Sequence, residues 1–113
     1  MKKTLPGAMK LRAIQLDLAR QMETLDYIRE FIDFSASFGY NALALYLEGR
    51  IRTESFPDMP KKESYTPEEM GRIVEYADRR GIEVIPVVSN LGHVEQFLRF
   101  PRLARFAELR GGR

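Results

Sequence analysis

The stretch Ile85-Pro86-Val87-Val88-Ser89-Asn90-Leu91-Gly92-His93 passes from an apolar run into a polar turn, and this passage decides the fold class. Two earlier runs, 13–18 and 41–47, are also apolar and also end in polar residues, and segments with helical spacing follow them. This alternation is typical of α/β proteins with a parallel βαβαβα chain. Because ligands bind at the carboxyl ends of parallel strands, the three polar clusters predict the position of a site.

The predicted helices have clear boundaries. The first spans roughly 23–38, and Gly39 ends it in a position that favours a left-handed residue. The second begins with Thr66 as N-cap, Pro67 at the first helical position and Glu69 completing a capping box. Its apolar stripe is predicted to be buried and consists of Met70, Ile73, Val74 and Ala77. Two further short helical segments are expected over 94–100 and 102–109.

The second and third strands carry further information about the sheet. One face of the second strand holds Leu43, Leu45 and Leu47, and the other holds smaller or polar residues. This division favours a closed barrel, with leucines toward outer helices, over a flat sheet that is apolar on both faces. The third strand, 82–88, contains Pro86, which lacks an amide donor, so we expect a bulge or an irregular ladder there.

Composition limits the function classes. The 113 residues allow one domain, in which 18 Lys and Arg oppose 16 Asp and Glu, and this balance argues against nucleic-acid binding. With no cysteine and one histidine, we expect no metal centre and no cofactor. No run approaches the ~18 apolar residues of a membrane span, and the basic start lacks a long apolar core. We therefore expect a cytoplasmic protein without membrane contacts, unless an upstream segment directs its parent for export.

Three motifs together resemble the catalytic barrel of family-20 glycoside hydrolases, the β-N-acetylhexosaminidases. Residues 12–20 (RAIQLDLAR) are similar to that family's Arg-Gly-x-x-x-Asp-x-x-Arg opening. Residues 65–70 and 76–86 are similar to its second helix and third strand, and Gly92-His93 matches its Pro-Gly-His turn. Two departures stand out: residues 44–50 replace the family's His-x-His-Leu and aspartate pair, and Leu91 replaces its proline.

The resemblance implies the first three units of a (β/α)8 TIM barrel, which needs about 250 residues when complete. We assign 1–10 as a lead-in and 11–113 as a partial barrel domain of a glycoside hydrolase. In the complete family enzyme, an Asp-Glu pair after the fourth strand acts in a substrate-assisted, retaining hydrolysis of terminal N-acetylhexosamine or related β-glycosides. No catalytic residue can be assigned in this chain, so we expect the isolated chain to be inactive.

The resemblance also implies roles for three residues near the first and third strands. His93 is expected in a network that supports the catalytic carboxylates; the alternative is a turn histidine bonded to backbone. Arg12 matches the family's sugar-binding arginine, although it lies at the start of its strand, where a structural ion pair is the alternative. Asp17 shares a face with Gln15, and it contacts either substrate or an arginine at position 12, 20 or 50.

Three further residues are predicted to contact substrate from the strand ends. Glu48 and Arg50 follow the second strand, where a sugar contact competes with an ion pair between Glu48 and Arg50 or Arg52. Asn90 follows the third strand and either contacts a sugar hydroxyl or shapes the turn.

Two readings other than a hydrolase fragment remain open. One is a non-catalytic carbohydrate-binding or scaffolding half-barrel. Whether the chain is a hydrolase fragment or such a half-barrel, the open edges of its sheet would promote self-association. The other is a barrel isomerase acting on sugar phosphates, whose glycine-rich phosphate loop is expected late in the barrel.

Overall fold

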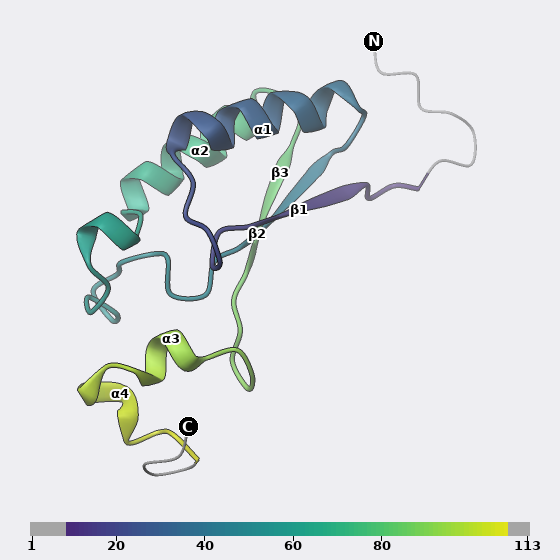
Figure 1. Ribbon diagram of the computed structural model, residues 1–113. Coiled ribbons are helices and arrows are strands. Elements are labelled where there is room, and N and C mark those ends of the chain that lie inside the picture. Colours follow the sequence, from purple (N-terminus) through teal and green to yellow (C-terminus); the bar gives the residue numbers. More distant parts are fainter. Residues whose placement is uncertain (1–8, 109–113) are drawn as a thin grey trace.

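The computed structural model describes residues 9–108, which form a three-stranded parallel sheet with helices (Figure 1). The elements follow in the order β1 (Ala13–Asp17), α1 (Leu25–Ser37), β2 (Ala42–Tyr46), η1 (Lys61–Glu63), α2 (Pro67–Asp78), β3 (Glu83–Val87), α3 (Glu95–Leu98) and α4 (Pro101–Ala104). The strand order is β1-β2-β3, and both neighbouring pairs are parallel. The predicted βαβαβα chain is therefore confirmed.

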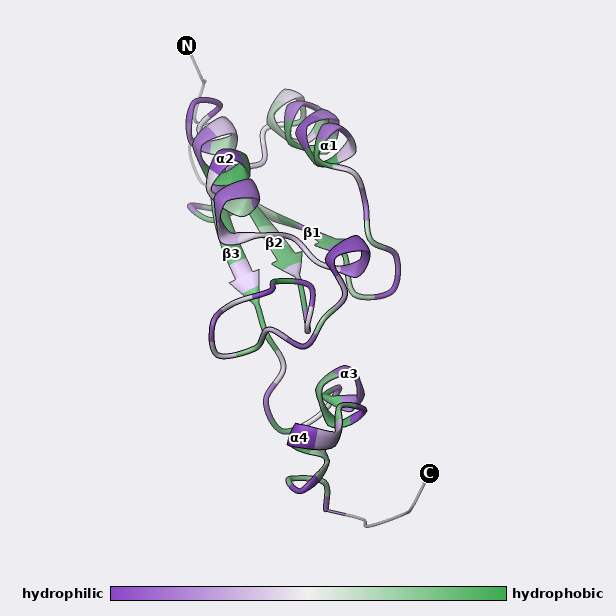
Figure 2. Ribbon diagram, turned by 90° about the vertical axis from the view of Figure 1, so that its left-hand side faces the viewer, coloured by the Kyte–Doolittle hydropathy of each residue, from purple (hydrophilic) through white to green (hydrophobic). Residues whose placement is uncertain are grey.

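The register explains which side chains are buried. Leu43 and Leu45 of β2 are fully buried, and their partners in β1 are Ile14 and Leu16. Helices α1 and α2 cover this face of the sheet, and the core contains Ile28 and Ile32 of α1 with Met70, Ile73 and Ala77 of α2 (Figures 1 and 2). The opposite face presents Ala13, Gln15 and Asp17 of β1, which are exposed. Within residues 9–108, the sheet thus has one covered face and one open face.

The helix boundaries follow the local signals closely. Helix α2 begins with the complete capping box between Thr66 and Glu69, as predicted. Thr24 caps α1 through a hydrogen bond from the amide of Tyr27, so α1 begins slightly later than predicted. Gly39 has a φ of 82°, which places it in the left-handed region expected after a helix. No helix among residues 9–108 is long and apolar enough for a membrane span.

One prediction about β3 and one about α2 were wrong. Strand β3 pairs with β2 in continuous register through Leu45 and Pro86, without a bulge. The amide of Glu83 and the carbonyl of Val87 both bond toward β2, so the nitrogen of Pro86 faces the free edge, where no donor is needed. Val74 was predicted to be buried, but it is 47% exposed, whereas Met70, Ile73 and Ala77 of the same stripe are buried.

The connection between β2 and α2 holds the last two helices below the carboxyl ends of the strands (Figure 1). Phe56 in this connection packs against Phe97 and Phe100, with ring centroids 4.8 and 5.7 Å apart. Arg102 of α4 forms an ion pair with Asp58 at 2.5 Å. These contacts make the connection part of the scaffold around the strand ends.

Candidate functional site

The carboxyl ends of β2 and β3 are joined by a small polar network. The hydroxyl of Tyr46, the last residue of β2, lies 2.9 Å from the Ser89 hydroxyl beyond β3. The same Tyr46 hydroxyl donates to Glu48 Oε1 at 3.3 Å. In register, Tyr46 lies beside Asp17 of β1 and Val87 of β3. The polar clusters of β2 and β3 therefore meet at one rim, as the sequence predicted, whereas the contribution of Ser89 was not anticipated.

Glu48 adopts an unusual backbone conformation at this rim. Its φ is 43°, in the left-handed region that non-glycine residues rarely occupy. Gly49, which follows it, is buried, and a Cβ at position 49 would lie 3.2 Å from Cε1 of Phe56. The chain thus turns where a side chain at position 49 would be in tight contact with the Phe56 ring. Glu48 itself remains partly accessible, and its role as a sugar contact stays a prediction.

Asp17 organises the turn that follows β1. Its Oδ1 accepts hydrogen bonds from the amides of Ala19 and Arg20, at 2.9 and 3.2 Å. The ion pairs found among residues 9–108 do not include Asp17, so the predicted pairing with an arginine at 12, 20 or 50 is absent there. The Asp17 side chain is exposed on the open face of the sheet, and its contact with substrate stays a prediction.

Arg50 clamps two loops together beneath the rim. Its Nε and Nη2 donate to the carbonyls of Leu18 and Ala19, at 3.0 and 2.7 Å, and its Nη1 donates to the carbonyl of Glu63 at 3.1 Å. Each of its three guanidinium nitrogens thus donates to a backbone carbonyl. This geometry favours a structural role for Arg50 over the predicted sugar contact, and it replaces the expected ion pair with Glu48.

Arg12 lies at the amino end of β1, opposite the rim. Its Nε donates to the carbonyl of Gly39 at 2.8 Å, and its Nη1 donates to the carbonyl of Met9 at 2.7 Å. The side chain therefore joins the start of β1 to the end of α1. This placement agrees with the expected position of Arg12 at the start of its strand, and its role in sugar binding stays a prediction.

Asn90 and His93 lie in the turn after β3, and both are exposed. The side-chain oxygen of Asn90 accepts a hydrogen bond from the amide of Leu91 at 2.7 Å, which shapes the turn. His93 has a φ of 55°, the second left-handed non-glycine residue of the described chain. Both residues lie on the rim side of the sheet, as predicted, and their functional roles stay predictions.

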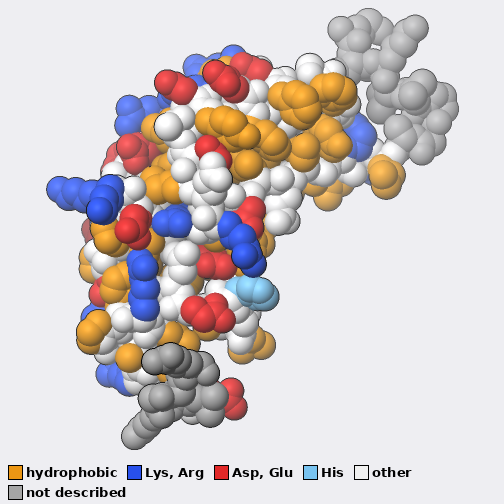
Figure 3. All heavy atoms as spheres, viewed as in Figure 1, with side chains coloured by type: hydrophobic (Ala, Val, Ile, Leu, Met, Phe, Trp, Pro, Cys, Tyr) orange, Lys and Arg blue, Asp and Glu red, His pale blue; other side chains and the backbone are white. Residues whose placement is uncertain are grey.

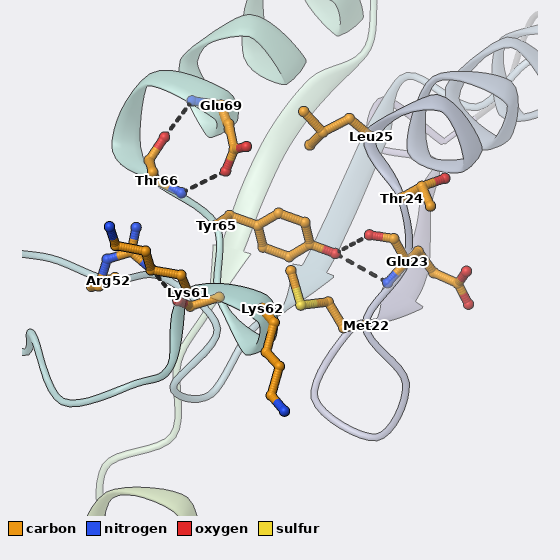
Figure 4. A pocket seen from close by; sticks show the side chains of 11 residues that line it. Met22, Glu23, Thr24, Leu25, Arg52, Lys61, Lys62, Tyr65, Thr66 and Glu69 are labelled. Carbon is orange, nitrogen blue, oxygen red and sulfur yellow. Dashed lines mark hydrogen bonds between the residues drawn. The ribbon is translucent and has the colours of Figure 1, made fainter.

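A hollow of about 510 Å³ lies beside the rim, between the loop after β1 and the connection before α2 (Figure 4). The Tyr65 side chain crosses it, and its hydroxyl donates to the carbonyl of Glu23 at 2.6 Å and accepts from the Glu23 amide at 3.1 Å. Burial raises the pKa of Tyr65 to about 12. This hydroxyl is a neutral anchor for the loop. Arg52, Lys61 and Lys62 also line the hollow, which the sequence did not suggest.

Among residues 9–108, no three His, Cys, Asp or Glu side chains gather closely enough to hold a metal ion. The rim thus offers carboxylate, hydroxyl and imidazole groups, which can exchange hydrogen bonds with sugar hydroxyls. Asp17, Glu48, Asn90 and His93 lie at or beyond the carboxyl ends of the strands. Arg50 joins the loop after β1 to η1, and Arg12 lies at the opposite end of β1.

Comparisons with known proteins identify relatives of this arrangement. The model of glycosyl hydrolase family 20, catalytic domain, matches residues 9–108. Hexosaminidase D of Bos taurus is 28% identical over 100 residues, covering 88% of this chain and 29% of that protein. A beta-hexosaminidase of Akkermansia muciniphila is 30% identical over 101 residues, covering 73% of this chain and 20% of that protein. The chain therefore spans less than a third of the length of these relatives.

Solved structures show the same likeness in three dimensions. The beta-N-acetylhexosaminidase from Bacteroides fragilis is 32% identical, with a TM-score of 0.73 over 83% of this chain and 22% of that chain. The GH20 beta-N-acetylhexosaminidase from Streptomyces coelicolor A3(2) is 26% identical, with a TM-score of 0.72 over 79% of this chain and 21% of that chain. From its motifs, its parallel βα units and these matches, the chain belongs to glycosyl hydrolase family 20 and forms an N-terminal part of that family's barrel.

Proposed function

We propose that this chain supplies the first three rim segments of a sugar pocket in a β-N-acetylhexosaminidase-like glycoside hydrolase. The substrate would be a terminal N-acetylhexosamine or a related β-glycoside. The observation that carries the proposal is the joining of β2 and β3 at their carboxyl ends through the Tyr46 and Ser89 hydroxyls, 2.9 Å apart. In βα barrels, this end of the sheet is where substrates bind.

The proposed reaction of the complete barrel is a retaining, substrate-assisted hydrolysis. The acetamido oxygen of the sugar attacks the anomeric carbon while a carboxylic acid protonates the departing oxygen; water then opens the cyclic intermediate and restores the proton. The acid and its partner belong to an adjacent Asp-Glu pair in this family, and the sequence contains no such pair. The role proposed for Glu48 and His93 is to hold sugar hydroxyls and support the reacting carboxylates.

We further propose that the isolated chain binds N-acetylhexosamine weakly and does not hydrolyse glycosides. The experiment measures nitrophenol release from the β-N-acetylglucosaminide and, in parallel, amide chemical shifts during titration with N-acetylglucosamine. We expect no release above that of a Glu48→Gln, His93→Ala variant, and saturable shifts at the strand ends that this variant loses. Turnover above the variant would refute the inactivity, whereas shifts spread away from the rim would refute the pocket.

The titration also distinguishes a part of a hydrolase from the two other functions considered, an isomerase and a carbohydrate-binding half-barrel. A sugar phosphate that binds in preference to N-acetylglucosamine would favour an isomerase. Tight binding of N-acetylglucosamine without turnover would favour a non-catalytic carbohydrate-binding half-barrel. A matched control is Arg20→Gln, because Arg20 is an exposed cation on the same rim whose backbone amide already caps the Asp17 turn. We expect this control to leave the shifts unchanged.

A further inference from the structure

The hydroxyl of Tyr46 takes part in two hydrogen bonds at the ends of β2 and β3. It donates to Glu48 Oε1 at 3.3 Å, and its oxygen lies 2.9 Å from Ser89 Oγ, a contact in which either hydroxyl can be the donor. All three side chains are half-buried. They come from neighbouring strands and contact one another directly, so this series of hydrogen bonds lies entirely within residues 9–108.

The number of available protons decides the direction of the series. A tyrosine hydroxyl carries one proton to donate, and a carboxylate carries none and only accepts. A hydrogen bond to a carboxylate is roughly twice as strong as one between neutral groups, so Tyr46 gives its proton to Glu48. Ser89 must then donate to the Tyr46 oxygen, because that hydroxyl has no second proton. The protons therefore point from Ser89 through Tyr46 to Glu48.

This order leaves only acceptors at the two ends of the series. Ser89 Oγ has given its proton to Tyr46 and keeps its lone pairs. Among residues 9–108, no hydrogen bond reaches Glu48 Oε2. Ser89 Oγ and the Glu48 carboxylate flank the same Tyr46 hydroxyl, so they are close enough to contact neighbouring hydroxyls of one sugar ring. A ligand that binds both ends must supply the hydrogen-bond donors.

We propose that Ser89 and Glu48 accept hydrogen bonds from two neighbouring hydroxyls of one sugar, and that Tyr46 is the positioning residue that fixes this polarity. The inference rests on the proposed function and adds to it the feature of the sugar that the rim selects. In an N-acetylhexosamine, carbon 1 carries the bond that is broken and carbon 2 carries the acetamido group. The neighbouring ring hydroxyls that remain are those on carbons 3 and 4.

Anionic ligands do not suit this polarity. A phosphate, sulfate or carboxylate offers acceptors at neutral pH, and it would meet the negative charge of Glu48. Arg50, two residues beyond Glu48, does not compensate, because its guanidinium already donates to three backbone carbonyls. On the face of the molecule that Figure 3 shows, Lys and Arg side chains are interspersed with Asp and Glu rather than gathered into a cationic patch. The rim therefore selects a neutral sugar with adjacent free hydroxyls.

The first experiment replaces single hydroxyls of the ligand with fluorine, which cannot donate a hydrogen bond. Amide chemical shifts of the 113-residue chain are followed during titration with N-acetylglucosamine and with its 3-fluoro and 4-fluoro analogues. We expect each analogue to bind on the order of tenfold more weakly than the parent sugar, because one acceptor of the rim loses its donor. The 6-fluoro analogue is the matched control, and it should bind like the parent.

The second experiment tests the positioning role of Tyr46 through a change of selectivity. In Tyr46→Phe, Ser89 keeps its proton and can donate it to the ligand, so the penalty for one of the two fluoro analogues should fall to about threefold or less. Ser89→Ala should weaken binding of the parent sugar on the order of tenfold and abolish the penalty at that same position. Ser89→Thr keeps the hydroxyl and should restore both values.

A matched control for the loss of a tyrosine hydroxyl is Tyr27→Phe, because Tyr27 is 43% exposed on α1. This control should leave the selectivity unchanged. Circular dichroism checks that every variant is folded. If Tyr46→Phe does not fold, the comparison of Ser89→Ala with Ser89→Thr still decides whether the Ser89 hydroxyl accepts from the sugar.

The outcomes separate this inference from the proposed function. If N-acetylglucosamine causes no saturable shifts at the strand ends, the proposed function is refuted and this inference with it. If the parent sugar binds at the rim but the 3-fluoro and 4-fluoro analogues bind equally well, only the hydroxyl pair is refuted. Unchanged selectivity in a folded Tyr46→Phe variant would overturn the positioning role, and wild-type binding by Ser89→Ala would remove Ser89 from the pair.

Discussion

Replacing Arg50 with methionine should destabilise the protein strongly, although the residue lies close to a predicted sugar site. The guanidinium donates to the carbonyls of Leu18, Ala19 and Glu63, at distances between 2.7 and 3.1 Å. A hydrogen bond to a charged group contributes about 1.5–3 kcal/mol, and the partial exposure of Arg50 reduces this value. We therefore expect a loss of roughly 2–4 kcal/mol for the three bonds together, because methionine keeps the apolar stem but none of the donors.

Urea denaturation, followed by circular dichroism, measures this loss. Arg50→Lys should be intermediate, since an ammonium keeps the charge but cannot reproduce the planar fork that reaches all three carbonyls. Arg20→Met is the control, because Arg20 is an exposed cation on the same rim. If Arg50→Met unfolds at the same urea concentration as the control while its response to N-acetylglucosamine disappears, the clamp is wrong and Arg50 is a sugar contact.

Three further substitutions test the framework around the rim. Tyr65→Phe should lose about 1–3 kcal/mol in urea titrations at neutral pH, because the Glu23 backbone loses its partner. The raised pKa of Tyr65, about 12 against an ordinary 10, stabilises the folded chain below pH 10, so wild type should lose roughly 2–3 kcal/mol more than Tyr65→Phe between pH 10 and 12. Gly49→Ala should cost about 1–2 kcal/mol in the same titration, because its Cβ meets Phe56 at 3.2 Å. The control Gly71→Ala, which meets nothing within 4 Å on α2, should be neutral or slightly stabilising. Thr66→Ala should lower thermal stability by about 1 kcal/mol, through loss of the capping box; an unchanged melting temperature would contradict it.

The parts of the fold that could be predicted from the sequence depend on local or periodic signals. The capping box of α2 involves residues three apart, and the left-handed Gly39 follows directly from the end of a helix. The parallel order of the strands follows from the alternation of apolar runs with helical segments. Val74 shows the limit of such signals. Its spacing fits the buried stripe of α2, but burial also depends on what the helix packs against, and Val74 is exposed.

The sequence predicted where the candidate site lies, but it predicted only some of the contacts that its side chains make. Strand ends can be located from the sequence, because each apolar run stops at a definite residue. Contacts between a side chain and a distant backbone carbonyl leave no pattern in the sequence, so the Arg50 clamp could not be foreseen. Ser89 was within reach of prediction, because it lies two residues beyond Val87, the register partner of Tyr46.

The contacts at the rim also divide its polar residues into two groups. Asp17, Arg50 and Asn90 already use their side chains on backbone amides or carbonyls, so they hold the loops in place. Glu48 and His93 have left-handed backbones, which cost free energy in non-glycine residues and persist only where the surrounding structure enforces them. Glu48 lies just beyond β2 and its carboxylate accepts a hydrogen bond from the Tyr46 hydroxyl, whereas His93 lies in the turn that follows β3. The backbone strain at these two positions is the reason why we propose Glu48 and His93, rather than the residues that hold the loops, as the sugar contacts.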